Sequence, residues 1–187
     1  GDKLVYPGLF IDQEVIDRSK RGCDLVVMGT KGERNALDKL MGSVTTRLMM
    51  NAGCPVLAIP ENAKYKGIEE ITYATTFSSK DEHFLAKLAN FGSVFNARIH
   101  FLHVSDDPKH GVEDEVYIEG LPSRSVKFSV VSNPSLMNGV DEFLKTHPSD
   151  VLALYIPKRN LWERLFHSSF SKKMTFHTDT PLFVFHE

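Results

Sequence analysis

The chain repeats one order of elements: strand, loop, helix, proline and strand. Residues 24–59 align without a gap onto residues 150–185, and Pro55 of the first copy falls on Pro181 of the second. Few positions are identical, but apolar positions match along both predicted strands. Parallel strands need a crossover connection between them, and a helix commonly supplies it. The repeat therefore predicts an α/β fold with a doubly wound, mostly parallel sheet.

A glycine motif follows the first strand of the first copy. The apolar run 25–28 has the length and composition of a buried strand, and the sequence after it reads Gly-x2-Gly-x9-Gly-Ser. Glycine lets backbone N–H groups approach an anion closely, and a helix N-terminus adds unpaired N–H donors and a positive dipole end. The motif predicts a phosphate site, although similar junctions occur in α/β proteins that bind nothing. The candidate binding residues are Met28, Gly29, Thr30, Gly32, Gly42, Ser43 and Val44.

Three segments around the motif resemble the C-terminal half of a universal stress protein domain: residues 24–30, 42–44 and 54–60. The resemblance implies a five-stranded parallel sheet of the adenine-nucleotide alpha-hydrolase type, with strand order 3-2-1-4-5. In many members of this family ATP, together with Mg²⁺, is bound at these glycines. The resemblance also implies a stress-response role through nucleotide binding or signalling rather than through turnover. We accordingly predict no catalytic residue.

The repeat and the resemblance together predict a tandem arrangement. Residues 1–60 correspond to the C-terminal half of one domain with an intact glycine motif, and residues 68–187 to a second domain. A polar segment, residues 60–67, links them. The family domain begins with two strands that have no counterpart in residues 1–60. We therefore expect this region to derive from a longer tandem protein that proteolysis or cloning shortened.

The second copy has lost the glycine motif. Its three glycines are replaced by Tyr155, Lys158 and Ser168, whose side chains would fill space that a backbone-bound phosphate needs. Thr76 stands where nucleotide-binding members carry an Asp that contacts the adenine. We expect nucleotide at the first copy only, and weakly, because the pocket for the base would come from the two strands that are missing there.

The last strands of the two copies, residues 56–59 and 182–185, are terminal edge strands in the family's sheet. Pairing them removes two apolar edges at once. We therefore predict that they pair at the seam between the copies. Dimers through these same strands are the other arrangement that the resemblance implies, which makes a homo-oligomer the alternative to pairing within one chain.

Two local predictions concern a helix and a loop. Residues 42–51 are predicted as a helix with Val44 and Leu48 on its inner face. The acidic segment 105–123 is predicted as a loop that holds at most one helical turn near Val116.

Composition and charge exclude several kinds of partner. With a formal net charge of -2, the chain has no basic field for nucleic acid. No apolar run approaches the roughly 20 residues of a membrane helix. Cys23 and Cys54 form no CxxC pair and share no metal-ligand spacing with histidine. We expect both to be small buried residues of a protein in the reducing cytoplasm.

The histidines suggest metal or nucleophilic chemistry, and we weigh both. His100 and His103 lie in one predicted strand on opposite faces, so a structural role is favoured over metal ligation. His167 precedes Ser168, but adjacent residues rarely form a nucleophile–base pair, and no G-x-S-x-G elbow is present.

Two other functions remain open at this point. The first is a scaffold of the same family that binds no nucleotide, in keeping with the degenerate second copy. An Asp in the opening strand of the first copy would argue against it. The second is a ligase that cleaves a pyrophosphate bond on this fold. It would need a glycine-rich loop after its first strand, and residues 75–80 contain no glycine.

Overall fold

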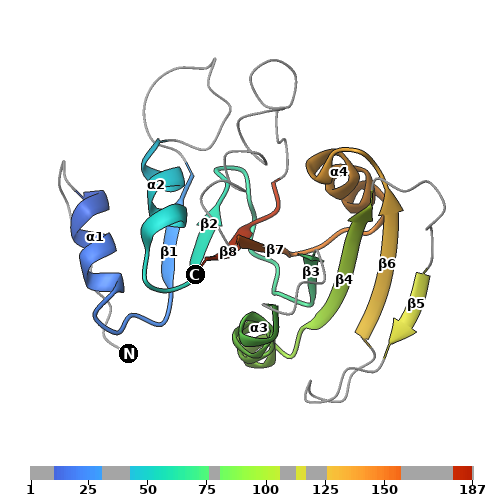
Figure 1. Cartoon of the computed structure of the whole chain (residues 1–187), viewed down its shortest axis with the longest axis horizontal. Helices are drawn as coiled ribbons and strands as arrows, with labels where there is room; N and C mark the ends of the chain where they lie inside the picture. Colours follow the sequence, from blue (N-terminus) through green and yellow to red (C-terminus); the bar gives the residue numbers. More distant parts are fainter. Residues whose placement is uncertain are drawn as a thin grey trace.

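The computed structural model describes residues 11–30, 43–75, 81–105, 113–116, 126–156 and 179–186 (Figure 1). These residues form four helices and eight strands in the described part of the chain. In chain order they are α1 (Ile11–Ser19), β1 (Val26–Gly29), α2 (Ser43–Asn51), β2 (Val56–Ile59), β3 (Glu70–Thr75), α3 (Asp81–Phe95), β4 (Arg98–Ser105), β5 (Glu113–Val116), β6 (Val126–Ser132), α4 (Leu136–Thr146), β7 (Val151–Ile156) and β8 (Leu182–His186).

All eight strands belong to one sheet in the order β1-β2-β8-β7-β3-β4-β6-β5. Strands β8, β7, β3, β4 and β6 are mutually parallel. Numbered by their place in the second copy, these strands read 5-4-1-2-3, which is the order that the resemblance implied. The predicted α/β class with a mostly parallel, doubly wound sheet is confirmed.

The seam between the two copies is an antiparallel pairing of β2 with β8, as predicted. Val56 lies opposite Val184, Leu57 opposite Phe183, and Ala58 opposite Leu182. All six residues are buried. The pairing turns two apolar edges into the interior of one continuous sheet.

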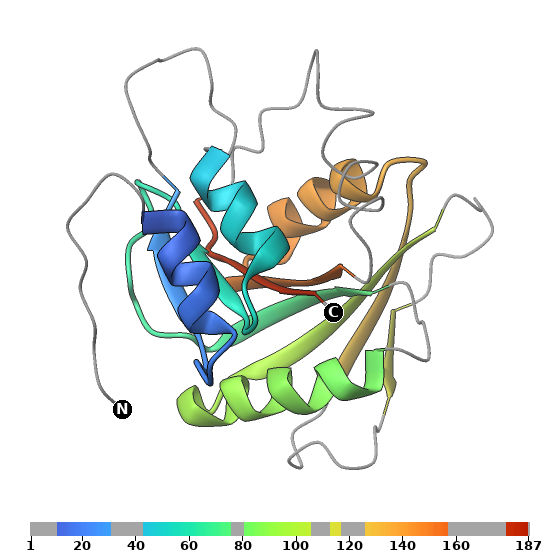
Figure 2. The ribbon, with the colours of Figure 1, turned by 60° about the vertical axis from the view of Figure 1, so that its left-hand side comes forward.

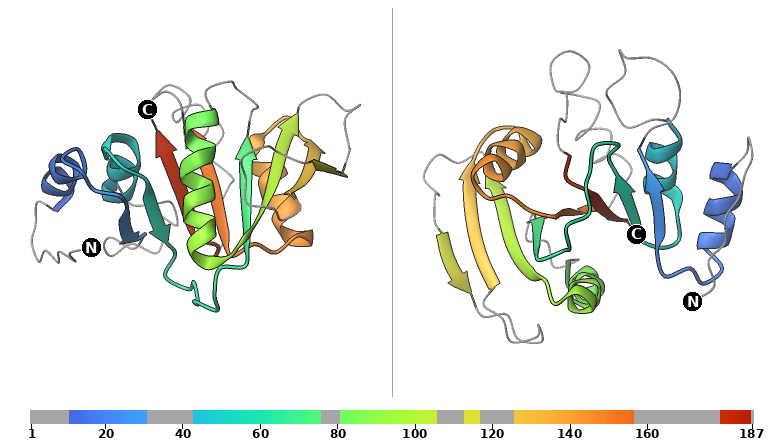
Figure 3. Two further views of the ribbon diagram at one scale, coloured as in Figure 1. Left: turned by 90° about the horizontal axis from the view of Figure 1, so that it is seen from below. Right: turned by 180° about the vertical axis from the view of Figure 1, so that it is seen from behind.

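Helices cover both faces of this sheet. One apolar cluster joins α2 and α4 to the sheet through Met49, Ala52, Val140 and Phe143. Helix α3 lies on the opposite face of the sheet (Figure 3). A second apolar cluster, which includes Phe84 and Leu88, joins it to that face. Helix α1 lies against α2 at the outer end of the molecule (Figure 2). The result is a helix–sheet–helix sandwich, with the first copy at one end of the sheet.

The buried face of α2 differs from the prediction. Leu48 is buried, but Val44 is 41% exposed, so its assignment to the inner face was wrong. The buried residues are instead Thr45, Leu48, Met49 and Ala52. They follow the spacing of one helical stripe, which places Val44 one residue away from it.

The acidic segment also differs from the prediction, because residues 113–116 form strand β5. It pairs antiparallel with β6, with Glu115 opposite Lys127 and Val116 opposite Val126. The predicted loop is therefore wrong at residues 113–116, and Tyr117 and Ile118, the rest of the possible helical turn, lie outside the described residues. Charged residues are common on edge strands, where they discourage pairing with other chains, so an acidic run is compatible with this position.

Asp150 fixes the start of the second copy's central strands. Its Oδ2 accepts hydrogen bonds from the backbone N–H groups of Glu69 (2.8 Å) and Glu70 (3.0 Å). Its own N–H donates to the carbonyl of Glu70 at 2.9 Å. The aspartate that precedes β7 thus aligns β7 with β3. Asp24 holds the matching place before β1 and is exposed.

Gly53 permits a close approach between the end of α1 and the turn before β2. Its N–H donates to Ser19 Oγ at 2.8 Å, and a Cβ built on it would lie 2.6 Å from Lys20 Cα. We predict that Gly53→Ala lowers the free energy of unfolding by about 1–3 kcal/mol, because backbone must move to make room. Urea unfolding followed by circular dichroism measures it.

Gly29→Ala is the matched control for this substitution. A Cβ on Gly29 would meet only the Ile59 carbonyl oxygen, at 4.0 Å. Its effect should stay within about 0.5 kcal/mol. Equal destabilisation by the two substitutions would contradict the packing described at Gly53.

Candidate functional site

The glycine motif begins where β1 ends, inside a β1–α2–β2 unit. Strands β1 and β2 are parallel, with Val26 opposite Val56 and Gly29 opposite Ile59. Helix α2 connects them, so its N-terminus lies at the same end of the sheet as Gly29. Five of the seven predicted binding residues lie in the described part of the chain. Gly32 and Gly42 lie outside it.

Two motif residues at the end of β1, Gly29 and Thr30, differ in what their backbone N–H groups bind. The Thr30 N–H donates to the Ile59 carbonyl at 3.0 Å, which engages that donor within the sheet. The Val26 N–H likewise donates to Pro55 at 2.9 Å. Because donors in a parallel ladder alternate in direction, the Gly29 N–H points away from β2, toward the outer edge of β1. Gly29 is exposed, and no described strand pairs with β1 on this side.

Helix α2 brings a second group of donors to this end of the sheet. It begins at Ser43, and its first turn holds no acidic side chain that would neutralise the positive end of the dipole. Val44 is exposed beside this helix start. The N–H groups of the first turn have no partner within the helix, and an anion is a natural acceptor for them.

Met28 has a structural part in this arrangement. Its side chain packs against the apolar cluster beneath α2, together with Val26. The side chain therefore holds the strand against the helix, and only the backbone of Met28 borders the motif.

Strand β1 forms one end of the sheet among the described residues. Val27 is 56% exposed, and Leu25 and Ile59 are only partly buried. Among the described residues, no strand flanks the motif on the side away from β2, where a pocket for a base would need a wall.

The corresponding place in the second copy is filled by an aromatic ring. Tyr155, which aligns with Gly29, stacks on Phe84 of α3 with ring centroids 5.5 Å apart and an interplanar angle of 27°. Lys158, Ser168 and Thr76 lie outside the described residues. The ring supports packing between β7 and α3, in a position where the first copy has a bare backbone.

The two strand histidines make structural hydrogen bonds. His100 Nε2 lies 2.7 Å from Ser129 Oγ, and His103 Nδ1 lies 3.0 Å from the Thr75 carbonyl oxygen. Within the described ranges no group of three or more metal-ligating side chains comes together. His167 lies outside these ranges.

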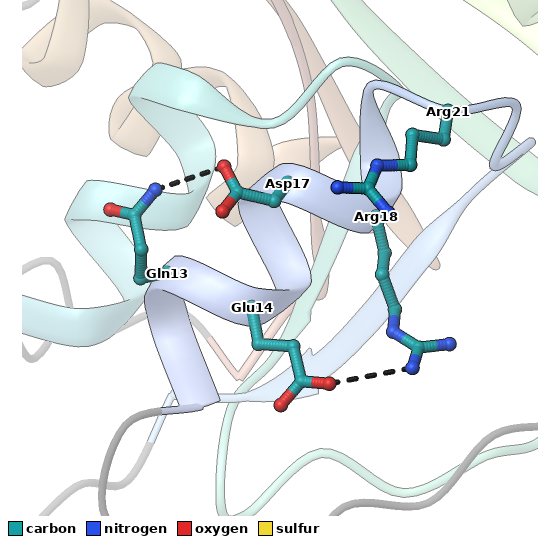
Figure 4. Close-up of a pocket in the computed structure, with 5 residues that line it drawn as sticks. All are labelled: Gln13, Glu14, Asp17, Arg18 and Arg21. Carbon is teal, nitrogen blue, oxygen red and sulfur yellow. Dashed lines mark hydrogen bonds and ion pairs between the residues drawn. The ribbon is translucent and has the colours of Figure 1, made fainter.

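A surface hollow on α1 is lined by Gln13, Glu14, Asp17, Arg18 and Arg21 (Figure 4). Two contacts join side chains within the helix: Arg18 lies 3.4 Å from Glu14 as an ion pair, and the Gln13 amide donates a hydrogen bond to Asp17 at 3.0 Å. All five residues are exposed. The hollow is a solvated helix surface and is separate from the glycine motif.

Sequence reasoning missed one contact, between the two cysteines. Cys23 lies just before β1 and Cys54 just before β2. The Cys23 thiol raises the pKa of the Cys54 thiol, an effect that requires the two groups to lie close together. Their distance from each other along the chain concealed this contact. The signal that could have revealed it is that both residues precede strands predicted to be neighbours.

No helix in the described part of the chain is both long enough and apolar enough to cross a lipid bilayer.

The comparisons with known proteins agree on one family. Residues 17–60 match the sequence model of the universal stress protein family. A universal stress protein of Methanocaldococcus jannaschii is 44% identical over 45 residues, which cover 24% of this chain and 26% of that protein. The match thus spans about a quarter of the curated relative, and the model match includes β1, α2 and β2.

Solved structures resemble a larger part of the chain. A universal stress protein from Archaeoglobus fulgidus superimposes with a TM-score of 0.66 at 17% identity, over 94% of this chain and 65% of that one. A putative universal stress protein from Pseudomonas aeruginosa gives 0.63 at 12% identity, over 96% and 69%. A functionally unknown protein from the same species gives 0.62 at 9% identity, also over 96% and 69%. At these identities the likeness is one of fold.

Proposed function

We propose that this chain, whose residues 17–60 match the universal stress protein family, functions in the stress response and binds an adenine nucleotide. The phosphates would lie at the glycine motif, between the end of β1 and the start of α2. The observation that carries the proposal is the β1–α2–β2 unit itself. It places an outward-pointing glycine amide and a helix N-terminus at the same end of the sheet.

The proposed phosphate contacts come from Gly29 and the first turn of α2 at Ser43 and Val44, with Gly32 and Gly42 as the other motif glycines. Thr30 would contribute through its side chain, because its N–H is engaged by Ile59. Mg²⁺ would accompany ATP by binding phosphate oxygens, its usual ligands in nucleotide sites. The seven predicted binding residues are uncharged, so they would contribute through backbone donors and hydroxyl groups.

We propose that this affinity is weak. Each charge-assisted hydrogen bond contributes roughly 1.5–3 kcal/mol, and ordering the nucleotide offsets part of the sum. The open outer side of β1 offers the base little surface to contact. A dissociation constant of about 0.1–1 mM, equivalent to about -5.5 to -4 kcal/mol, is the expected range.

Isothermal titration with MgATP tests the proposal. We predict that Gly29→Tyr, which gives the first copy the residue of the second, lowers the affinity by at least about tenfold, or 1.4 kcal/mol. Gly32→Tyr should do the same. Lys158→Gly should leave the affinity unchanged, because the second copy is proposed to bind no nucleotide.

Thermal unfolding of each variant separates loss of binding from loss of folding. Gly29 is exposed and has open space around it, so its substitution should leave the melting temperature unchanged. Micromolar affinity that survives Gly32→Tyr and disappears in Lys158→Gly would place the site in the wrong half of the chain and refute the proposal.

A scaffold that binds no nucleotide is the second candidate function. The stacking of Tyr155 on Phe84 favours it for the second copy, because a packed ring replaces the glycine there. In this chain β8 is already paired with β2, so a homo-oligomer that forms through a described sheet edge would use β1 or β5. The scaffold function would be supported if MgATP gave no binding heat and the chain sedimented as a dimer.

A further inference from the structure

The two cysteines lie side by side at the starts of two neighbouring strands. Strands β1 and β2 are parallel, with Val26 opposite Val56, and the Val26 N–H donates to the Pro55 carbonyl at 2.9 Å. The segments that lead into these strands therefore run together. Continued backwards, this register places Cys54 opposite Asp24, one residue from Cys23. With strands about 4.8 Å apart and a rise of about 3.3 Å per residue, that offset corresponds to a Cα separation of about 6 Å, within the roughly 4.4–6.8 Å that disulfides join.

Contacts from α1 hold these segments in place. Ser19 Oγ accepts the Gly53 N–H at 2.8 Å, and Lys20 packs against Gly53. These contacts fix the turn that leads to Cys23 against the turn that leads to Cys54. The two segments that carry the cysteines are thus held next to each other by backbone packing.

The two thiols differ in accessibility. Cys54 is 7% exposed, whereas Cys23 is only partly buried and donates a hydrogen bond to the Leu25 carbonyl at 3.3 Å. Burial, and then the hydrogen bond and charge of Cys23, raise the pKa of the Cys54 thiol to about 12. Cys54 therefore stays protonated at neutral pH, and an oxidant from solvent reaches Cys23 first.

We propose that Cys23 and Cys54 form a reversible oxidation site whose substrate is a hydroperoxide. The Cys23 thiolate attacks the terminal peroxide oxygen, the O–O bond breaks, and Cys23 becomes a sulfenic acid while the other fragment leaves as an alcohol or as water. The Cys54 sulfur then attacks the Cys23 sulfur, and the hydroxyl group leaves as water with the Cys54 proton. The two thiols lose two electrons and two protons, which the peroxide accepts.

The disulfide would close a chain loop that contains the glycine motif. Residues 23–54 include the end of β1 and the whole of α2. Cross-linking a chain restricts its unfolded state, so oxidation should stabilise this end of the sheet. A thiol reductant should reverse the effect.

Peptide mapping of the intact chain after treatment with hydrogen peroxide tests the proposal. Trypsin releases Cys23 in residues 22–31 and Cys54 in residues 48–64. We expect one species whose mass is the sum of these peptides less two hydrogens, which dithiothreitol converts back. The unfolding midpoint of the oxidised chain should rise by a few degrees and return on reduction.

Two single variants identify the role of each cysteine. In Cys54→Ala, Cys23 should remain a sulfenic acid that dimedone traps. In Cys23→Ala, the peroxide should consume the remaining thiol at least about tenfold more slowly than in the parent chain. Circular dichroism checks that both variants fold, and the mapping of the parent chain needs neither of them.

Three results would overturn the proposal. The first is a disulfide that joins two chains instead of the two peptides of one chain. The second is Cys23 oxidised to sulfinic acid while Cys54 remains a thiol. The third is a Cys23→Ala variant that reacts as fast as the parent chain.

Discussion

Residues 1–60 expressed alone should show no cooperative thermal transition by circular dichroism. In the whole chain, Met49, Val56 and Ala58 share an apolar cluster with Leu182 and Val184 of the second copy. Removing β8 would leave β2 as an apolar edge of a two-stranded sheet. Such a small sheet is marginal by itself, and a fragment of this length buries a small share of its surface.

Residues 68–187 are the matched control for this experiment. They retain the strands of the second copy in one sheet, with helices on both faces. A cooperative transition in this fragment, with none in residues 1–60, is the expected result. Native-like helix content and a sigmoidal melt in residues 1–60 would show that the first copy folds independently of the seam.

Phe183→Ala should lower the free energy of unfolding by about 3–5 kcal/mol, the range for aromatic truncation in a packed core. Phe183 is 2% exposed and stacks on Phe91 with centroids 4.3 Å apart. Its strand pairs with β2 on one side and β7 on the other, so the cavity would open at the seam. Urea unfolding followed by circular dichroism gives the value.

Tyr65→Ala provides the aromatic control for this measurement. Tyr65 is 79% exposed in the segment between β2 and β3, so its loss should change stability by less than about 0.5 kcal/mol. Similar values for the two substitutions would mean that Phe183 is not part of a packed seam.

The fold was predictable because its main signals are local and repeated. Pro55 and Pro181 mark the same junction before the last strand of each copy, and the apolar runs after them are short and continuous. Such runs identify buried strands, and the repeat indicates how the strands connect. The pairing of β2 with β8 was predictable because leaving two apolar strand edges unpaired is unfavourable.

The features that were missed depend on tertiary contacts. Val44 is apolar and lies close to the buried stripe of α2, but sequence periodicity alone does not fix where the stripe begins. Residues 113–116 become a strand through pairing with β6, although their own composition is unfavourable to strands. The contact between Cys23 and Cys54 depends on the register of β1 and β2, which no local pattern specifies.

The arrangement of elements around the glycine motif was predictable from the sequence, and the direction of its backbone donors was not. Glycine spacing identified the end of β1 and the start of α2, and the structure brings these two ends to one end of the sheet. The spacing did not reveal that the Thr30 N–H is engaged by Ile59. That detail depends on the alternating ladder between parallel strands, so it required the register of the pairing.

Hydrogen exchange of the intact chain tests most directly whether the two copies share one sheet. If β2 and β8 pair as described, their amides should exchange with protection similar to that of β3 and β7, because all four strands open together in one cooperative unit. If instead the amides of β2 exchange as fast as those of an unstructured peptide while β3 and β7 stay protected, the seam does not exist in solution. The β1–α2–β2 unit that carries the glycine motif would then lack the support of the second copy's sheet.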